Sequence, residues 1–132
     1  MSLYEAYEDV LTALFVYREA RGESFDAKRA VVHVILNRTK DAKGRWPKLR
    51  SEAILQPLQF SSFNRNDPNA TVMPHWNNRA WRECCQAVEC PGEDPTGGAN
   101  HYHSIPEGQP LPKWATPEKI TARIGAFTFY KL

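Results

Sequence analysis

The segment Ala30–Leu36 is the feature that most constrains the fold. Six of its seven residues are apolar, and His33 is the exception. A helix that is apolar on every side is stable only when other elements pack around it. A short β-strand is the competing interpretation, because four of the seven residues are β-branched. Charged and polar flanks extend the segment to helical length, so we predict a central helix with Ser24 or Asp26 as its N-cap and an end within residues 37–40.

A second helix is predicted directly before it, from about Tyr4 to Ala20. We expect Gly22 to supply its C-cap. Glu19 follows the apolar stripe at the same four-residue spacing, beside the buried face and near the negative end of the helix dipole. Such surroundings favour the protonated form of a carboxyl group, which a general acid needs. A surface glutamate at a frayed helix end is the plain alternative. The stripe consists of Leu3, Tyr7, Val10, Leu11, Leu14 and Phe15.

The rest of the chain changes from helix to strand. A short helix at Ser51–Leu55, with Ser51 as its cap, and a helix from about Asn78 to Cys90 complete the helical part. Alternating or β-branched residues then predict three strands. With 132 residues and no linker-like segment, the chain suits one domain, 1–132, of the α+β class: mainly α, with a small antiparallel β element at its C-terminal end. The strands are expected at residues 100–104, 119–124 and 127–130.

Charge and hydropathy exclude several classes of protein. The net charge is +2, and no Lys/Arg run reaches about five residues, so we expect no nucleic-acid partner. No apolar run approaches about 18 residues, which excludes a predicted membrane span. Residues 1–5 lack the basic and apolar regions of a secretory signal peptide. We therefore expect a monomer that stays in the cytoplasm or is exported by another route.

Metal and cofactor sites are not predicted. The three cysteines lie within residues 84–90, which implies reduced thiols and no disulfide framework. His101 and His103 form the only pair with a spacing typical of metal ligands, and His33 is interpreted as a core residue. The chain has no phosphate-binding loop and no dinucleotide-binding glycine motif. We therefore predict no metal and no cofactor.

Two sets of polar residues could carry chemistry. Glu19 could pair with Glu23, or with Asp67 or Asp94 from loops, but sequence spacing cannot choose among them. In an extended Gln59–Ser61 segment, Gln59 and Ser61 would lie on one side and Phe60 on the other. An amide and a hydroxyl beside a cleft suit a sugar, whereas an ordinary turn with a Phe anchor is the plain alternative.

Several motifs in order resemble those of one family over nearly the whole chain. They are similar to the SleB-type cell-wall hydrolases, the catalytic domains of spore-cortex-lytic enzymes with phage and proteobacterial relatives. The departures are Phe127, where many relatives have a histidine, and His101 and His103 around Tyr102, where relatives often have a Tyr-Tyr run. The matching segments are Glu19–Glu23, Val34–Arg38, Gln59–Ser61, Asp94–Ala99 with Tyr102, Arg123–Gly125 and Phe129–Tyr130.

The resemblance implies a lysozyme-like fold that acts on the glycan strands of peptidoglycan. It implies that Glu19 is the catalytic acid and that Gln59, Ser61 and Tyr102 hold the sugar in the cleft. The reaction it implies is that of a lytic transglycosylase, in which one glutamate serves as both acid and base and leaves a 1,6-anhydro sugar. Two alternatives stay open: a hydrolytic muramidase that uses a second carboxylate, and a wall-binding module without turnover. The absence of a predicted signal peptide departs from the secreted spore enzymes, so we expect a phage-type lysin that stays cytoplasmic until it is released to the cell wall, or export by another route.

Overall fold

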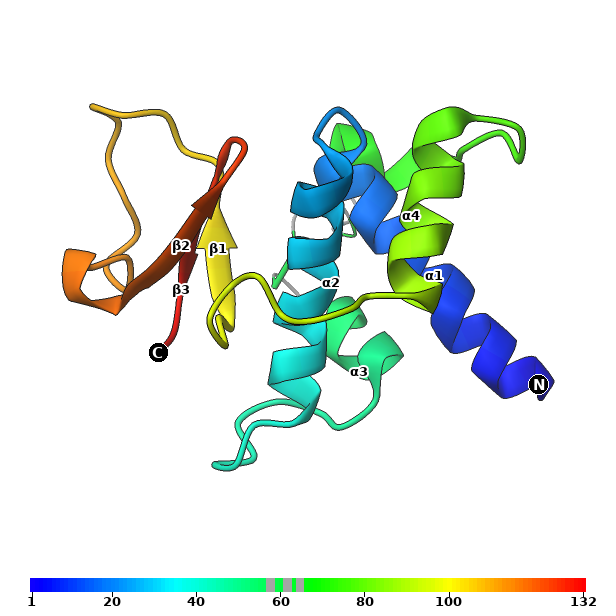
Figure 1. The fold of residues 1–132 in the computed structure, drawn as a ribbon, viewed down its shortest axis with the longest axis horizontal. Helices are drawn as coiled ribbons and strands as arrows, with labels where there is room; N and C mark the ends of the chain where they lie inside the picture. Colours follow the sequence, from blue (N-terminus) through cyan, green and yellow to red (C-terminus); the bar gives the residue numbers. More distant parts are fainter. Residues whose placement is uncertain (57–58, 61–62, 64–65) are drawn as a thin grey trace.

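The computed structural model describes residues 1–56, 59–60, 63 and 66–132, and places a helical body beside a small sheet (Figure 1). The sheet lies on one side of the helix Phe25–Thr39, and the other α-helices lie on the opposite side. This arrangement agrees with the predicted mainly helical α+β fold. The helices are α1 (Leu3–Ala20), α2 (Phe25–Thr39), α3 (Arg50–Leu55) and α4 (Arg79–Glu89), with 3-10 helices η2 (Pro68–Thr71) and η3 (Pro117–Lys119), and the strands are β1 (His101–His103), β2 (Ile120–Ile124) and β3 (Phe127–Tyr130).

Helix α2 is central, as its apolar run predicts. Val31, Val34 and Ile35 are fully buried, and the helix contacts α1, α3, α4 and β2. Its N-cap is Ser24, whose hydroxyl accepts the Ala27 N–H at 3.2 Å. A strand at this position would leave no element for the three other helices to pack around. The alternative interpretation of this segment is therefore wrong.

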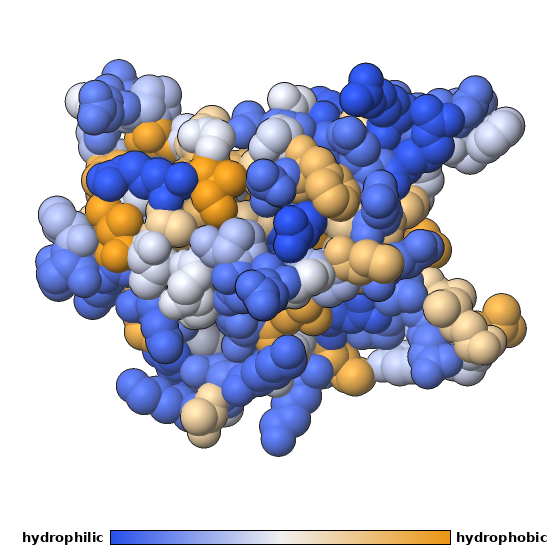
Figure 2. All heavy atoms as spheres, viewed as in Figure 1, coloured by the Kyte–Doolittle hydropathy of each residue, from blue (hydrophilic) through white to orange (hydrophobic). Residues whose placement is uncertain are grey.

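The apolar stripe of helix α1 is buried only in the C-terminal half of the helix. Phe15 is fully buried, but Leu3, Tyr7 and Val10 are 91%, 50% and 58% exposed. The first turns project beyond the other helices (Figure 1), and hydrophobic atoms are visible at that corner of the surface (Figure 2). The predicted stripe is thus wrong for this half, because periodicity reports an apolar face but not whether another element covers it.

Two predicted helix caps are also wrong. Helix α1 ends at Ala20 with Arg21 as its C-cap, in the right-handed conformation, and Gly22 has no positive φ. Helix α3 begins one residue earlier than expected, at Arg50, with Leu49 as its N-cap and no side-chain capping bond. The Ser51 N–H instead donates to Glu8 Oε1 at 3.2 Å, so a side chain of α1 takes the place of a local cap.

The three strands form one antiparallel sheet in the order β1–β3–β2. Tyr102 lies opposite Phe129 in the register. Strand alternation places Tyr102, Phe127 and Phe129 on the face that packs against the helical core. His101, His103, Thr128 and Tyr130 lie on the outer face. None of the described helices has the length and apolar character needed to cross a membrane.

Candidate active site

Glu19 lies in the last turn of α1 and lines an open cavity of about 460 Å³. The turn between α1 and α2 forms one wall, Asn69 contributes from η2, and Ser104 contributes from the loop after β1. The tip of the β2–β3 hairpin, with Ala126 and Phe127, closes the opposite side. The side chain of Glu19 is partly exposed, so a ligand in the cavity has access to its carboxyl group.

Tyr102 points from the sheet to this carboxyl group, and its hydroxyl donates a hydrogen bond to Glu19 Oε1. Its ring lies against Phe60, with centroids 6.3 Å apart, and against the edge of Phe127, at 5.3 Å. Burial and the adjacent negative charge of Glu19 raise the pKa of Tyr102 well above its ordinary value. Tyr102 therefore keeps its proton and acts as a donor. The structure thus brings together two of the four predicted site residues from opposite parts of the chain.

Gln59 does not line the cavity around Glu19, although the sequence predicts it as a sugar-binding residue. Its Oε1 accepts a hydrogen bond from Arg38 Nη1 at 3.1 Å. Arg38 is buried, donates from Nε to the Asn100 carbonyl at 2.7 Å, and lies 5.0 Å from the ring of Phe60. Burial lowers the pKa of Arg38 to about 10, which leaves it charged at neutral pH. Ser61, the fourth predicted residue, lies outside the described residues.

Glu23 lines the same cavity, but one of its carboxylate oxygens has a structural partner. Oε1 accepts the Ala126 N–H at 3.0 Å, across the gap between the helical turn and the hairpin. Gly125 beside it has φ +58°, and a Cβ at this position would collide with Glu23 Oε1. Glu23 and the hairpin glycine therefore form a single contact that closes the cavity wall.

The helical side of this contact is fixed by Lys28. Its side chain is 2% exposed, and Nζ donates to the Glu23 carbonyl at 2.9 Å and to Glu83 Oε1 at 2.8 Å. Lys28 therefore links the turn that carries Glu23 to α4. Removing one partner of a buried cation destabilises a protein by several kcal/mol. Lys28 therefore holds this turn firmly against α4.

Asp94 and Asp67, the other candidate second carboxylates, serve local structure. Asp94 accepts bonds from Thr96 N and Oγ1 at 2.8 and 2.6 Å, from Gly98 N at 3.1 Å and from Asn37 Nδ2 at 2.9 Å. Burial alone would raise the pKa of Asp94, but the Thr96 and Asn37 hydrogen bonds lower it below its ordinary value. Asp67 caps η2 by accepting the Asn69 N–H at 2.8 Å. Neither aspartate lines the cavity around Glu19.

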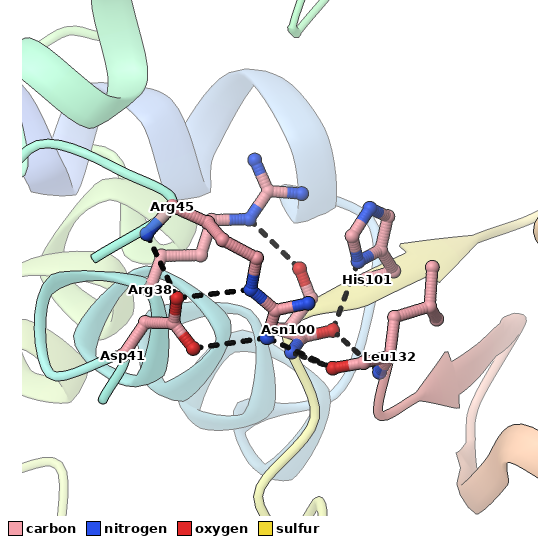
Figure 3. Close-up of polar contacts among 6 residues, drawn as sticks. All are labelled: Arg38, Asp41, Arg45, Asn100, His101 and Leu132. Atoms are coloured by element: carbon pink, nitrogen blue, oxygen red, sulfur yellow. Dashed lines mark hydrogen bonds and ion pairs between the residues drawn. The ribbon is translucent and has the colours of Figure 1, made fainter. Parts of the chain in front are cut away.

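His101, part of the predicted metal-like pair, belongs to a polar cluster that fastens Leu132, two residues beyond the end of β3 (Figure 3). Asn100 accepts the Leu132 N–H at 3.0 Å and donates to its carbonyl at 3.1 Å, and Arg45 donates to the same carbonyl at 2.9 Å. His101 Nδ1 lies 2.9 Å from Asn100 Oδ1 and donates to it. Burial, with the nearby Arg38 charge, lowers the pKa of His101 to about 4. His101 is therefore a neutral, engaged side chain at pH 7.

His103 and His33 are engaged in the same way. His103 Nδ1 accepts the Ile105 N–H at 3.0 Å, which leaves Nε2–H to donate to the Tyr130 hydroxyl at 2.8 Å. His33 is buried, and its Nε2 lies 3.0 Å from the Pro91 carbonyl, which confirms its prediction as a core residue. No group of three or more His, Cys, Asp or Glu side chains in the described ranges is arranged to hold a metal ion. All three cysteines are free thiols.

Comparison with known proteins gives consistent matches. A family model described as Cell Wall Hydrolase matches residues 22–130. The chain is 34% identical to a spore cortex-lytic enzyme of Halalkalibacterium halodurans over 90% of this chain and 33% of that protein. It is 31% identical to a spore cortex-lytic enzyme of Bacillus cereus over 97% of this chain and 46% of that protein. The chain thus spans between a third and a half of these curated relatives.

Two solved structures have the same fold. The catalytic domain of the Bacillus cereus SleB protein matches with a TM-score of 0.70 and 31% identity, over 94% of this chain and 89% of that chain. The catalytic domain of the germination-specific lytic transglycosylase SleB from Bacillus anthracis matches with a TM-score of 0.71 and 31% identity, over 94% and 93%. Both matches confirm the predicted mainly helical fold with its small C-terminal sheet.

Proposed function

Because this chain belongs to the cell wall hydrolase family, we propose that it cleaves the glycan strands of peptidoglycan as a lytic transglycosylase. The observation that carries the proposal is the Glu19 carboxyl group, which lies in an open cavity with Tyr102 as its hydrogen-bond donor. Glu23, the other carboxylate of the cavity, accepts the Ala126 N–H instead. One of the two matched structures is of a protein named as a lytic transglycosylase, which supports the same subtype for this chain.

Glu19 performs both proton transfers in this mechanism. The protonated carboxyl group first donates its proton to the glycosidic oxygen, and the bond between that oxygen and the anomeric carbon breaks. The resulting carboxylate then removes the proton of the 6-hydroxyl of the same sugar. The freed oxygen bonds to the anomeric carbon, and a 1,6-anhydro-N-acetylmuramic end forms without water. The 2-acetamido group of the sugar assists at the anomeric carbon between the two steps.

Tyr102 orients the acid. Its hydroxyl occupies Oε1, which leaves Oε2 to exchange the proton with the substrate. Phe127 lines the cavity and packs against the Tyr102 ring, so it holds the tyrosine without taking part in proton transfer. The histidine that many relatives have at this position is therefore not needed for the acid–base steps proposed for this chain.

Hydrolysis by a second carboxylate is the alternative that a specific observation favours. Glu23 lines the same cavity as Glu19, and an activated water attacking the anomeric carbon would give a reducing sugar. The hydrogen bond from the Ala126 N–H to Glu23 weighs against this role, because Glu23 would have to break that bond to act as a general base toward water. A wall-binding module without turnover would not need Tyr102 to be aligned on the Glu19 carboxyl group.

The test is mass spectrometry of the fragments released from purified peptidoglycan by the wild type, Glu19→Gln and Glu23→Gln. We expect anhydro products, lighter by one water than reducing products, from the wild type. Glu19→Gln should lose at least about a hundredfold in rate, as expected for removal of general acid–base catalysis. Reducing products, or a Glu19→Gln variant that keeps its rate, would overturn the proposal. Binding to walls without any released fragment would favour the non-catalytic module.

A further inference from the structure

A second cavity, of about 280 Å³, lies on the outer face of the sheet, beneath the loop 104–116. The loop leaves the end of β1, arches away from the sheet and returns through η3 to β2 (Figure 1). The sheet contributes Ile120, Thr128 and Tyr130 to the lining, and the loop contributes Ile105 and Leu111. Nothing in the proposed reaction uses this cavity.

The loop is fixed at both ends, so the cavity is preformed. At its start, the Ile105 N–H donates to His103 Nδ1 at 3.0 Å. Near its end, the Trp114 ring packs edge-on against Tyr130 at 5.2 Å. Prolines at 106, 110 and 112 restrict φ between these anchors. Gly108, with φ +82°, forms a tight turn in which the Gln109 N–H donates to the Pro106 carbonyl at 3.3 Å.

The charges that line the cavity are of opposite sign and have no partners among the described residues. Arg123 extends from β2, and Glu107 extends from the tight turn of the loop. Neither forms an ion pair within the described ranges. Both nitrogens of His103 are already engaged, with Ile105 and Tyr130. Figure 2 shows hydrophobic atoms interrupted by strongly hydrophilic ones on this side of the molecule. A ligand that fits has an apolar stem, one anionic group and one cationic group.

The two cavities share the same ends of β1 and β3. Ser104 lines the Glu19 cavity, whereas its neighbours His103 and Ile105 line the outer one. In the same way Phe127 faces the first cavity and Thr128 the second. A substrate group attached to a sugar in the Glu19 cavity therefore reaches the outer cavity by passing around the end of β1.

We propose that the outer cavity binds the peptide stem of the peptidoglycan whose sugars occupy the Glu19 cavity. This inference rests on the proposed function. The stem combines the required chemistry: carboxylates along its length, the alkyl chain of a diamino acid and the ammonium group at the end of that chain. Arg123 pairs with a stem carboxylate, Glu107 accepts the ammonium group, and Ile105, Leu111 and Ile120 cover the alkyl chain.

The first arm of the test measures binding without turnover. A soluble stem tetrapeptide, L-Ala-γ-D-Glu-diaminopimelate-D-Ala, is titrated into isotope-labelled Glu19→Gln protein and followed by NMR. We expect the amide shifts to be confined to residues 103–111 and 120–128. Adding Arg123→Gln should weaken binding about fivefold, the size expected for one exposed ion pair. Lys113→Gln also removes one positive charge, from the loop over the cavity, but Lys113 does not line the cavity, so this variant is the matched control and should bind as the parent does.

The second arm measures turnover on two polymers: peptidoglycan with intact stems, and the same strands stripped of stems by an amidase. Arg123→Gln should raise KM about fivefold on the intact polymer, with kcat unchanged, and should leave the stripped polymer unaffected. No shift in loop 104–116 on adding the tetrapeptide would overturn the stem site, as would equal losses in Arg123→Gln and Lys113→Gln. A wild type that cleaves neither polymer contradicts the proposed function, and the binding arm then still decides the stem site.

Discussion

The contact between Glu23 and the β2–β3 hairpin makes a quantitative prediction about two substitutions and their combination. Glu23→Ala removes the acceptor of the Ala126 N–H, which costs about 1 kcal/mol for one part-exposed hydrogen bond. Gly125→Ala forces an alanine into a left-handed conformation, at a cost of about 1–2 kcal/mol, and its Cβ also displaces Glu23 Oε1. Gly125→Ala should therefore cost about 2–3 kcal/mol in the wild type.

The double variant separates the two contributions. Once Glu23 is alanine, the added Cβ at position 125 meets no carboxylate, and only the backbone strain remains. Gly125→Ala should then cost about 1 kcal/mol less than it does in the wild type, which is a coupling typical of residues in direct contact. Urea unfolding of the four proteins measures this difference. Additive costs within about 0.3 kcal/mol would refute the contact.

Activity of the same variants decides whether Glu23 holds the cavity wall or takes part in chemistry. Glu23→Gln keeps an oxygen that can accept the Ala126 N–H, so we expect the turnover rate to stay within about threefold of the wild type. Glu23→Ala should lower the rate more, because Phe127 and the hairpin tip are then held less firmly at the cavity edge. The assay is the fall in turbidity of a suspension of purified walls. A folded Glu23→Gln protein as inactive as Glu19→Gln would refute the structural role and favour hydrolysis.

Two further predictions concern tyrosine and histidine. Tyr102→Phe removes the donor to Glu19 but keeps the ring packing, so kcat should fall about tenfold with KM little changed. Steady-state kinetics on solubilised glycan measures both constants, and an unchanged kcat would contradict the orienting role. The C2 proton of His101 should titrate with a midpoint near pH 4 in NMR spectra. This pKa lies below that of an unfolded histidine, about 6.5. The contribution of neutral His101 to stability is therefore present above pH 6.5 and is lost as the pH falls toward 4. His101→Gln should show a smaller loss of stability over this range in urea unfolding.

Sequence patterns predict the elements of this fold better than the surfaces between them. The apolar run of α2 identifies the central element, because only packing on every side buries it, and the flanks that extend it to helical length identify that element as a helix. The same reasoning is wrong for Leu3 and Tyr7 of α1, whose face is apolar but uncovered. Periodicity describes one element at a time, whereas burial depends on what packs against that element. The Gly22 cap is wrong for a related reason: the chain leaves α1 through Arg21 in the right-handed conformation, and the pattern along one helix does not report what fixes the turn after it.

The candidate site shows the same limit more sharply. Glu19 stands out because a carboxylate continues an apolar series, but its donor, Tyr102, lies 83 positions away. The partner of Glu23 is 103 positions away. A single sequence carries no signal for such pairings, so the motif resemblance was needed to place Tyr102 at the site. It could not separate residues that touch the substrate from residues that position the wall, and Gln59 is bonded to Arg38 instead of facing the Glu19 cavity.

The two glutamates of the Glu19–Glu23 motif have different surroundings because the helix ends between them. In a continuous helix, residues four positions apart share one face, and both carboxylates would point into the same space. Here α1 stops at Ala20, the chain reverses, and Glu23 reaches across the cavity to the hairpin while Glu19 stays on the helix. One carboxylate is then free for the substrate, and the other holds the hairpin whose Phe127 packs on Tyr102. Because Tyr102 donates to Glu19, the contact made by Glu23 stabilises the orientation of the proposed acid through the sheet. The proposed reaction uses only Glu19 for proton transfer, yet by this route it also depends on Glu23.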